Sequence, residues 1–323
     1  MPRIFCVLFH DVSHFKVRRE FGEKFRVIEE QHGAGCRSEA PRGLLPRWLV
    51  VNLLPFPLLL GGVGLLLRQL WLAWRGRLPV APPWIGPRLD LTDVVLLIAG
   101  GFVLLGEVLM PQLLQAPIVA LLGALPVSAA FRQGLQVFLL YLLVMAVPLM
   151  ILIAMLRGRG DPPTGGWLQW HWRPLAGALV RALTTLLMAL PAVALSGWLV
   201  ERLWPEAGGS NPLLDLVLTS ADPLALVCFG LTATVLAPLF EEILFRGTLL
   251  PVLAQRWGGG AAVLVSAAVF ALAHLSLSEG LPLFVLGIGL GWLRWRSGRL
   301  APSVLMHAFW NGLTLLNLLV LAT

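Results

Sequence analysis

Eight stretches of mostly apolar residues, separated by short polar segments, constrain this chain more than any other feature of its sequence. A helix needs about 20 such residues to cross the hydrocarbon core of a bilayer. A further apolar stretch, 116–130, contains two prolines and favours a re-entrant or interfacial element. The sequence therefore predicts an all-α fold, a polytopic transmembrane helix bundle with an intramembrane polar cavity. The expected spans cover residues 48–74, 94–115, 135–156, 175–200, 223–248, 260–278, 280–296 and 300–322.

Composition supports a membrane protein and excludes several other classes. Charged residues make up 13% of the chain and hydrophobic residues 58%, whereas soluble domains carry about 25% charged residues. Such a chain has too few polar side chains to cover a soluble globule, and too many apolar ones to be disordered. The net charge of +7 comes from basic residues spread singly or in small groups between apolar stretches. Because this distribution is typical of loops between spans, no nucleic-acid partner is expected.

The chain divides into three parts by composition. Residues 1–46 are a polar N-terminal extension that we expect to be disordered, and residues 47–222 supply the N-terminal transmembrane helices. Residues 223–323 hold the last spans and most of the unusual polar residues. The positive-inside bias places the basic loops in the cytoplasm, so we expect a multi-pass protein of the cell membrane, in a bacterium the inner membrane. These loops are residues 75–88, 157–173, 246–256 and 294–299.

Ionisable residues inside a span are energetically costly, so each one is a candidate for function. Span five contains Glu241 and Glu242, followed by Arg246. On a helix, Glu242 and Arg246 are neighbours four residues apart and can form an ion pair. Glu241 points about 100° away around the helix axis and is not neutralised in this way. We therefore interpret Glu242 as structural and Glu241 as a candidate general base.

The next spans add two imidazoles and an amide to this set. His274 is the only ionisable residue of span six, and His307 and Asn311 share one face of span eight. Glutamate and histidine can activate a water, and a second imidazole and an amide can donate hydrogen bonds to a developing oxyanion. The chemistry that uses every member of this set is hydrolysis of an amide bond inside the membrane.

Other intramembrane protease chemistries lack their reagents in this sequence. It has no HExxH spacing for a helical zinc protease and no aspartate inside a span for a two-aspartate mechanism. A serine protease of the rhomboid kind would have Gly-x-Ser-Gly, but the nearest stretch, Ala194-Leu195-Ser196-Gly197, begins with alanine and lies near the wrong end of its span. We therefore interpret Ser196 as a helix-packing residue. Glu107, the deepest ionisable residue of the first four spans, is interpreted as a structural hydrogen-bonding residue.

The order and spacing of the polar residues resemble the three motifs of the CPBP family, the CAAX proteases and bacteriocin-processing enzymes, also called Abi. This family includes the type II CAAX prenyl endopeptidases, and the resemblance covers roughly residues 223–320. It implies an eight-helix bundle with a conical cavity open to the cytoplasm and to the bilayer. In this chain the motifs read Glu241-Glu242-x-x-x-Arg246, Phe270-x-x-x-His274 and His307-x-x-x-Asn311.

The resemblance also implies roles for these residues. Glu241 and His274 would position and activate the attacking water. His307 and Asn311 would form the oxyanion site, and Arg246 would orient the glutamates. The implied substrate is a membrane-associated or lipid-modified protein or peptide within the lipid bilayer.

Several alternatives stay open at this point. The resemblance implies no cofactor firmly, and a zinc ion held by Glu241, His274 and His307 is the alternative to a metal-free mechanism. A non-catalytic membrane scaffold or bacteriocin-immunity protein of the same fold is a second function. A transporter that uses Glu107, Glu242 and His274 as a relay is a third. The sequence does not indicate the oligomeric state.

Helix depth adds one constraint on the site. If span five ended at Gly247, Glu241 would lie about 9 Å from the cytoplasmic end of its helix, at 1.5 Å per residue. His274 would lie about 21 Å deep on the same scale, so the two side chains could not meet. We therefore expect helix five to continue to about Ala254, which places Arg246 inside the bundle rather than in a loop.

Overall fold

A computed structural model describes residues 55–204, 216–217, 220 and 222–322, and the polar extension expected at residues 1–46 lies outside this part. Every regular element within the described part is a helix. Six helical stretches are long and apolar enough to cross a membrane, and a seventh is a shorter apolar helix. The helical stretches are α4 (Pro55–Trp74), Leu91–Gly123, α7 (Ala129–Leu156), α8 (Leu175–Leu203), Pro223–Trp257, α13 (Gly259–Ala273), α14 (Leu277–Ser297) and α15 (Ala301–Ala322).

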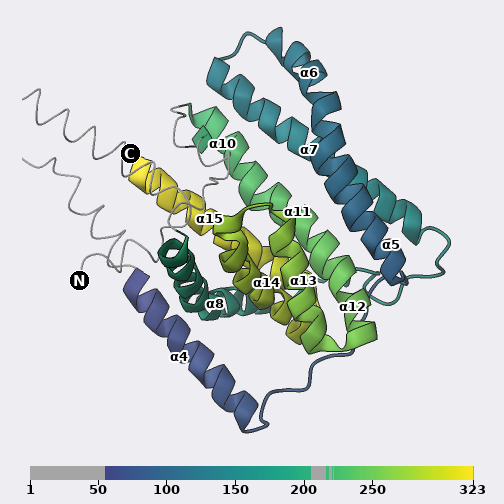
Figure 1. Cartoon of the computed structure of the whole chain (residues 1–323), viewed down its shortest axis with the longest axis vertical. Coiled ribbons are helices and arrows are strands. Elements are labelled where there is room, and N and C mark those ends of the chain that lie inside the picture. Colours follow the sequence, from purple (N-terminus) through teal and green to yellow (C-terminus); the bar gives the residue numbers. More distant parts are fainter. Residues whose placement is uncertain (1–54, 205–215, 218–219, 221, 323) are drawn as a thin grey trace, which may run out of the picture.

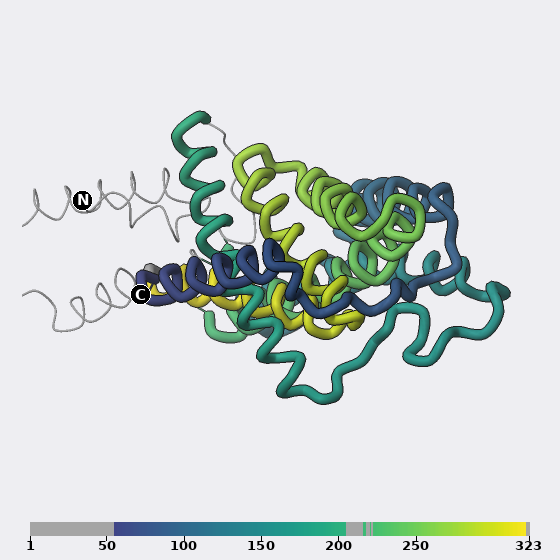
Figure 2. The backbone as a smooth tube through the Cα atoms, turned by 90° about the horizontal axis from the view of Figure 1, so that it is seen from below, coloured from purple at the N-terminus to yellow at the C-terminus, as the bar shows by residue number. Residues whose placement is uncertain are grey.

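The helices pack side by side as a bundle, which confirms the predicted all-α membrane fold. α14 packs against α13, α8 and α15, while α4 packs along α8 at the outside of the bundle. The helix Pro223–Trp257 runs between α15 and α7 in Figure 1. The connections 75–90 and 157–174 contain no helix, and Figure 2 shows both as extended segments that join helices consecutive in the sequence.

The second helical stretch corrects the interpretation of residues 116–130. We expected a separate re-entrant or interfacial element there. Instead, α5 (Leu91–Val95), η2 (Leu96–Leu109) and α6 (Met110–Gly123) form one continuous helix, and Pro117 lies inside α6. A proline removes only one backbone donor, and local adjustments within a transmembrane helix can compensate for that loss. Pro117 was therefore insufficient to break the helix, whereas Pro126 lies in the non-helical turn between α6 and α7.

The predicted extension of helix five is confirmed. α10 (Pro223–Leu231), η3 (Thr232–Leu236), α11 (Ala237–Glu242), η4 (Ile243–Leu249) and α12 (Leu250–Trp257) form one helix that continues well beyond Gly247. It ends at Gly258, whose φ of +78° is a conformation that favours glycine. α13 begins directly after it, at Gly259. It is shorter than the expected span, 260–278, because it ends at Ala273 and His274 forms its C-terminal cap.

Three stretches of the described chain have π-helical hydrogen bonding, namely η2, η3 and η4, and each precedes a proline. The residues directly before Pro111, Pro238 and Pro251 donate their N–H groups to the carbonyl five residues back. A proline ring clashes with the carbonyl four residues back and has no N–H of its own, and a wider turn relieves this clash. As a result, α11 and its two glutamates lie between two π-helical stretches.

Two helix caps tie the start of α7 to the start of α10. Ser128 caps α7 and donates its hydroxyl hydrogen to Asp222, whose other oxygen caps α10. This hydrogen bond holds the pKa of Asp222 below its usual value. The two helices also pack along each other, so the link fixes one end of the helices that carry Tyr141 and Glu241.

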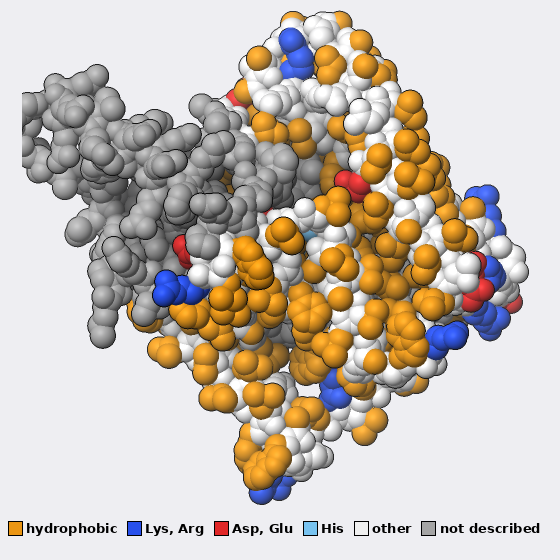
Figure 3. Space-filling model, viewed as in Figure 1, with side chains coloured by type: hydrophobic (Ala, Val, Ile, Leu, Met, Phe, Trp, Pro, Cys, Tyr) orange, Lys and Arg blue, Asp and Glu red, His pale blue; other side chains and the backbone are white. Residues whose placement is uncertain are grey.

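Hydrophobic side chains cover most of the described face in Figure 3, and basic side chains lie toward its edges. Many large apolar side chains are exposed on the bundle, including Leu60, Leu121 and Leu195. Soluble monomers rarely expose such continuous apolar surface, and the hydrocarbon of a bilayer would cover it.

Candidate active site

Three helices bring the predicted site residues together in the interior of the bundle. α11 carries Glu241 and Glu242, and the next stretch, η4, carries Arg246. His274 lies at the C-terminal cap of α13. His307 lies on α15 one helical turn before Asn311. Five of these six residues form a connected cluster of ion pairs and hydrogen bonds, and Asn311 has a different partner.

Arg246 and Glu242 form the buried base of the cluster. Arg246 Nη1 lies 2.8 Å from Glu242 Oε1, and both side chains are fully buried. The guanidinium also donates to the carbonyl of Gly287 on α14 at 3.3 Å and lies 4.2 Å from the centroid of the Phe270 ring. The predicted pair is thus present, and Arg246 connects α14 and α13 to the glutamates.

His307 joins the two glutamates. Its Nδ1 lies 3.0 Å from Glu242 Oε1, and its Nε2 lies 3.8 Å from Glu241 Oε2. Since a carboxylate can only accept, Nδ1–H is the donor to Glu242. In the neutral tautomer, His307 Nε2 therefore has a free lone pair facing Glu241.

His274 approaches the same oxygen from another helix. Its Nδ1 lies 2.8 Å from the carbonyl oxygen of Phe270, which can only accept, so Nδ1 carries the hydrogen. The Nε2 atom of the neutral ring then has a lone pair and lies 3.8 Å from Glu241 Oε2. Two imidazole nitrogens from different helices thus face one carboxylate oxygen.

Solvent access differs between the members of this cluster. The side chains of His274 and Glu241 are 26% and 14% exposed, whereas those of His307 and Glu242 are 4% and 0% exposed. Glu241 Oε2 itself has no hydrogen-bond partner among the described residues. As the helical spacing predicted, Glu242 forms the ion pair with Arg246 and Glu241 does not.

Asn311 has a partner that the sequence did not indicate. Its Nδ2 donates to the backbone carbonyl of Ala233, on η3, at 2.7 Å. In the π-helical register the donor for this carbonyl would be the nitrogen of Pro238, which has no hydrogen. Asn311 therefore compensates for the missing donor and connects α15 to η3, which leaves one amide hydrogen for another acceptor.

Replacing Asn311 with leucine should destabilise the folded protein by about 1–3 kcal/mol, because the Ala233 carbonyl would lose its donor in an apolar environment. Thermal unfolding in detergent would measure this change. Replacement of Thr184, whose hydroxyl bonds only within α8, with valine is a suitable control. Equal unfolding temperatures for Asn311→Leu and the parent would contradict this role.

Two further residues, Tyr141 and Glu107, interact with Glu241, and sequence reasoning missed the first of them. Tyr141 on α7 lies with its hydroxyl 3.5 Å from Glu241 Oε1. The one feature of the sequence that could have indicated Tyr141 is its position as a single tyrosine within an apolar span. Glu107 on η2 interacts electrostatically with both residues. Glu107 forms no hydrogen bond with the other described residues, and its interpretation as a structural hydrogen-bonding residue stays a prediction.

The described side chains do not form a metal-binding arrangement. Zinc ligands lie about 2.0–2.3 Å from the ion, usually in tetrahedral geometry. Among the described residues, no group of three histidine, cysteine, aspartate or glutamate side chains is placed to hold a metal. The set proposed for zinc from the sequence, Glu241, His274 and His307, is not such a group in this arrangement.

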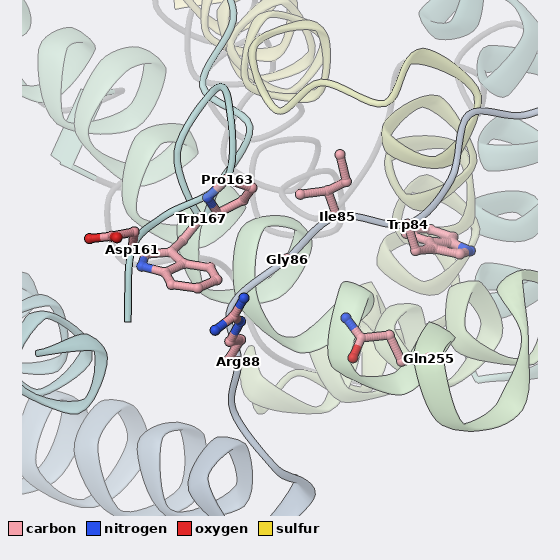
Figure 4. A pocket seen from close by; sticks show the side chains of 8 residues that line it. All are labelled: Trp84, Ile85, Gly86, Arg88, Asp161, Pro163, Trp167 and Gln255. Atoms are coloured by element: carbon pink, nitrogen blue, oxygen red, sulfur yellow. The ribbon is translucent and has the colours of Figure 1, made fainter. Parts of the chain in front are cut away.

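A separate cavity of about 330 Å³ lies where the two non-helical connections meet the end of α12. Arg88 lies with its guanidinium over the ring of Trp167, 5.5 Å from its centroid. Gln255 is roughly 21 Å along the helix from Glu241 at 1.5 Å per residue. This cavity is therefore distinct from the candidate site. Figure 4 labels its lining residues, Trp84, Ile85, Gly86, Arg88, Asp161, Pro163, Trp167 and Gln255.

The fold and this cluster define a polytopic membrane protein with an intramembrane glutamate–histidine site. The family model of type II CAAX prenyl endopeptidase Rce1-like proteins matches residues 223–313. The matched part of the chain runs from α10 into α15 and contains all six predicted site residues, in agreement with the resemblance that the sequence motifs indicated. Comparisons with curated proteins and with solved structures gave no match. This match supports a CAAX-protease-like function in general.

Proposed function

We propose that this chain is an intramembrane endopeptidase that hydrolyses a peptide bond of a membrane-associated or lipid-modified substrate. The observation that carries the proposal is the convergence of three acceptors, because Glu241 Oε2 faces both His274 Nε2 and His307 Nε2 at 3.8 Å. None of these three acceptor atoms carries a hydrogen in the neutral rings, so they cannot bond one another directly. They favour a small molecule that donates hydrogen bonds, such as water. That water is the proposed nucleophile.

The proposed reaction uses only side chains of the cluster. A water donates one hydrogen bond to Glu241 Oε2 and one to His274 Nε2, and Glu241 removes its proton as the oxygen attacks the carbonyl carbon. The carbonyl oxygen becomes an oxyanion, and the proton then passes to the leaving nitrogen as the carbon–nitrogen bond breaks. The products are a carboxyl group and an amine, so the reaction is a hydrolysis.

His307 and Asn311 are the proposed donors to the oxyanion. On taking up a second proton from solvent, His307 can donate from Nε2 to an oxyanion while Nδ1 still donates to Glu242. Glu241 Oε2 and His274 Nε2 then remain as the two acceptors for the water. Asn311 has one amide hydrogen left after bonding Ala233. Removing one such donor costs about 10²–10³-fold in turnover in other hydrolases.

Arg246 and Glu242 support the reaction without taking part in it. Their ion pair is fully buried and carries the hydrogen bond that orients the His307 ring. Polar groups held in this way need little rearrangement as charge develops, which is the basis of electrostatic preorganisation.

Substrate class is tested with the full chain in proteoliposomes. The substrates are a peptide with an isoprenylated C-terminal cysteine, the same peptide on a transmembrane anchor, and the same peptide without an anchor. We expect cleavage of the anchored peptides, detected by mass spectrometry, and little cleavage of the free one. Cleavage of none of them would instead favour a scaffold or immunity protein of the same fold.

Metal removal gives a further prediction. Because the proposed reaction uses only Glu241 and His274 to activate the water, turnover should persist after treatment with a membrane-permeant chelator. Metal analysis of the treated protein is the control for complete removal. Loss of turnover on chelation, with recovery on addition of zinc, would contradict the metal-free reaction and support a zinc-dependent one.

A further inference from the structure

Tyr141 is the only tyrosine of the 323-residue chain, and it contacts the proposed general base. It lies in the middle of α7 with its hydroxyl 3.5 Å from Glu241 Oε1. Its ring packs on the ring of Phe240, with 6.2 Å between the ring centroids. The hydroxyl is thus directed at the carboxylate by a ring that is itself held in place.

The two oxygens of Glu241 have different surroundings. Oε1 accepts from the Tyr141 hydroxyl, whereas Oε2 faces His274 Nε2 and His307 Nε2. A glutamate side chain rotates broadly about its last torsion angle. A donor on one oxygen therefore limits which oxygen can face the imidazoles.

We propose that Tyr141 is a positioning residue, which holds Oε1 of Glu241 and thereby directs Oε2 toward His274 and His307. This inference rests on the proposed function, because it assigns Oε2 as the oxygen that takes the proton from water. Tyr141 does not contact the reacting atoms.

The charges around Glu241 do not provide the same restraint. Arg246 interacts with Glu241 electrostatically, but its hydrogen bonds go to Glu242 and Gly287. Glu107 is a like charge and offers no donor in its ionised form. Among the described side chains, the Tyr141 hydroxyl is the one donor whose hydrogen bond fixes a Glu241 oxygen.

Replacing Tyr141 with phenylalanine removes the hydroxyl and keeps the ring. We expect kcat to fall roughly ten-fold with KM unchanged, since the lost contact acts on the base rather than on substrate binding. Thr184→Val removes a hydroxyl that bonds only within α8 and should leave kcat and thermal stability unchanged. An increase in KM alone, or parental kinetics, would overturn the positioning role.

A spectroscopic readout that does not depend on turnover follows from the single tyrosine. Tyrosine labelled with carbon-13 at the ring carbon that bears the hydroxyl gives one resonance from the full chain in detergent. Glu241→Gln should shift this resonance, because it weakens the acceptor. Glu201→Gln, at the exposed end of α8, should leave it unchanged. An identical resonance in the parent, Glu241→Gln and Glu201→Gln would overturn the inference.

The two readouts separate this inference from the proposed function. If no substrate is cleaved but the Tyr141 resonance responds to Glu241→Gln, the contact is upheld and the endopeptidase assignment fails. If substrates are cleaved and Tyr141→Phe turns over like the parent, the endopeptidase assignment stands and the positioning role of Tyr141 fails.

Discussion

Replacing Glu241 with glutamine should reduce turnover of an anchored peptide by roughly 10²–10⁴-fold, the usual contribution of a general base, while the protein still folds. Glutamine has the same shape but cannot take a proton from water. Glu241 makes no ion pair with Arg246, which bonds Glu242 instead, so its charge is not needed for packing. Cleavage kinetics in proteoliposomes and thermal unfolding in detergent measure the two effects.

Glu107→Gln is the matched control for this change. Glu107 is also a glutamate in the middle of a span and interacts electrostatically with Glu241, but it faces neither imidazole. The Glu107→Gln variant should therefore keep most of the turnover of the parent protein. If Glu107→Gln lost as much turnover as Glu241→Gln, or if Glu241→Gln were fully active, Glu241 would not be the base.

Replacing Arg246 with alanine should destabilise the protein by roughly 3–5 kcal/mol, because it leaves Glu242 buried without its charge partner. The change also removes the bond to the Gly287 carbonyl and the contact with the Phe270 ring, which join η4 to α14 and α13. We expect a lower yield of folded protein and a lower unfolding temperature, together with lost turnover.

Arg68→Ala is the control for loss of an intramembrane arginine. Arg68 lies on α4, where it is exposed, so its removal should change the unfolding temperature little. Parental stability of Arg246→Ala, with an increased KM as its only defect, would mean that Arg246 binds substrate rather than holding Glu242.

Local spacing in the sequence was sufficient for much of the fold and part of the site. The apolar stretches predicted the helix bundle, and the spacing of four residues predicted the buried pair of Glu242 with Arg246. Helix depth predicted that helix five continues beyond Gly247. Each of these inferences depends on the geometry of a single helix, which sequence periodicity reports directly.

The contacts between helices could not be predicted in the same way. The bond from His307 to Glu242 joins residues 65 positions apart, and that from Tyr141 to Glu241 joins residues 100 apart. The bond from Asn311 to Ala233 depends on a π-helical turn before Pro238. No local pattern encodes which carbonyl such a turn leaves without a donor, so the sequence indicated only an oxyanion role for Asn311.

The most direct test of the central claim is a single-turnover reaction of the full chain with an anchored peptide in heavy-oxygen water. Direct attack by a water that Glu241 activates predicts heavy oxygen in the new C-terminal carboxyl group of the product. It also predicts no covalent adduct in the intact mass of protein quenched during turnover. An adduct carrying part of the peptide would show that a side chain of the protein, rather than water, attacks the substrate, and would contradict the proposed mechanism.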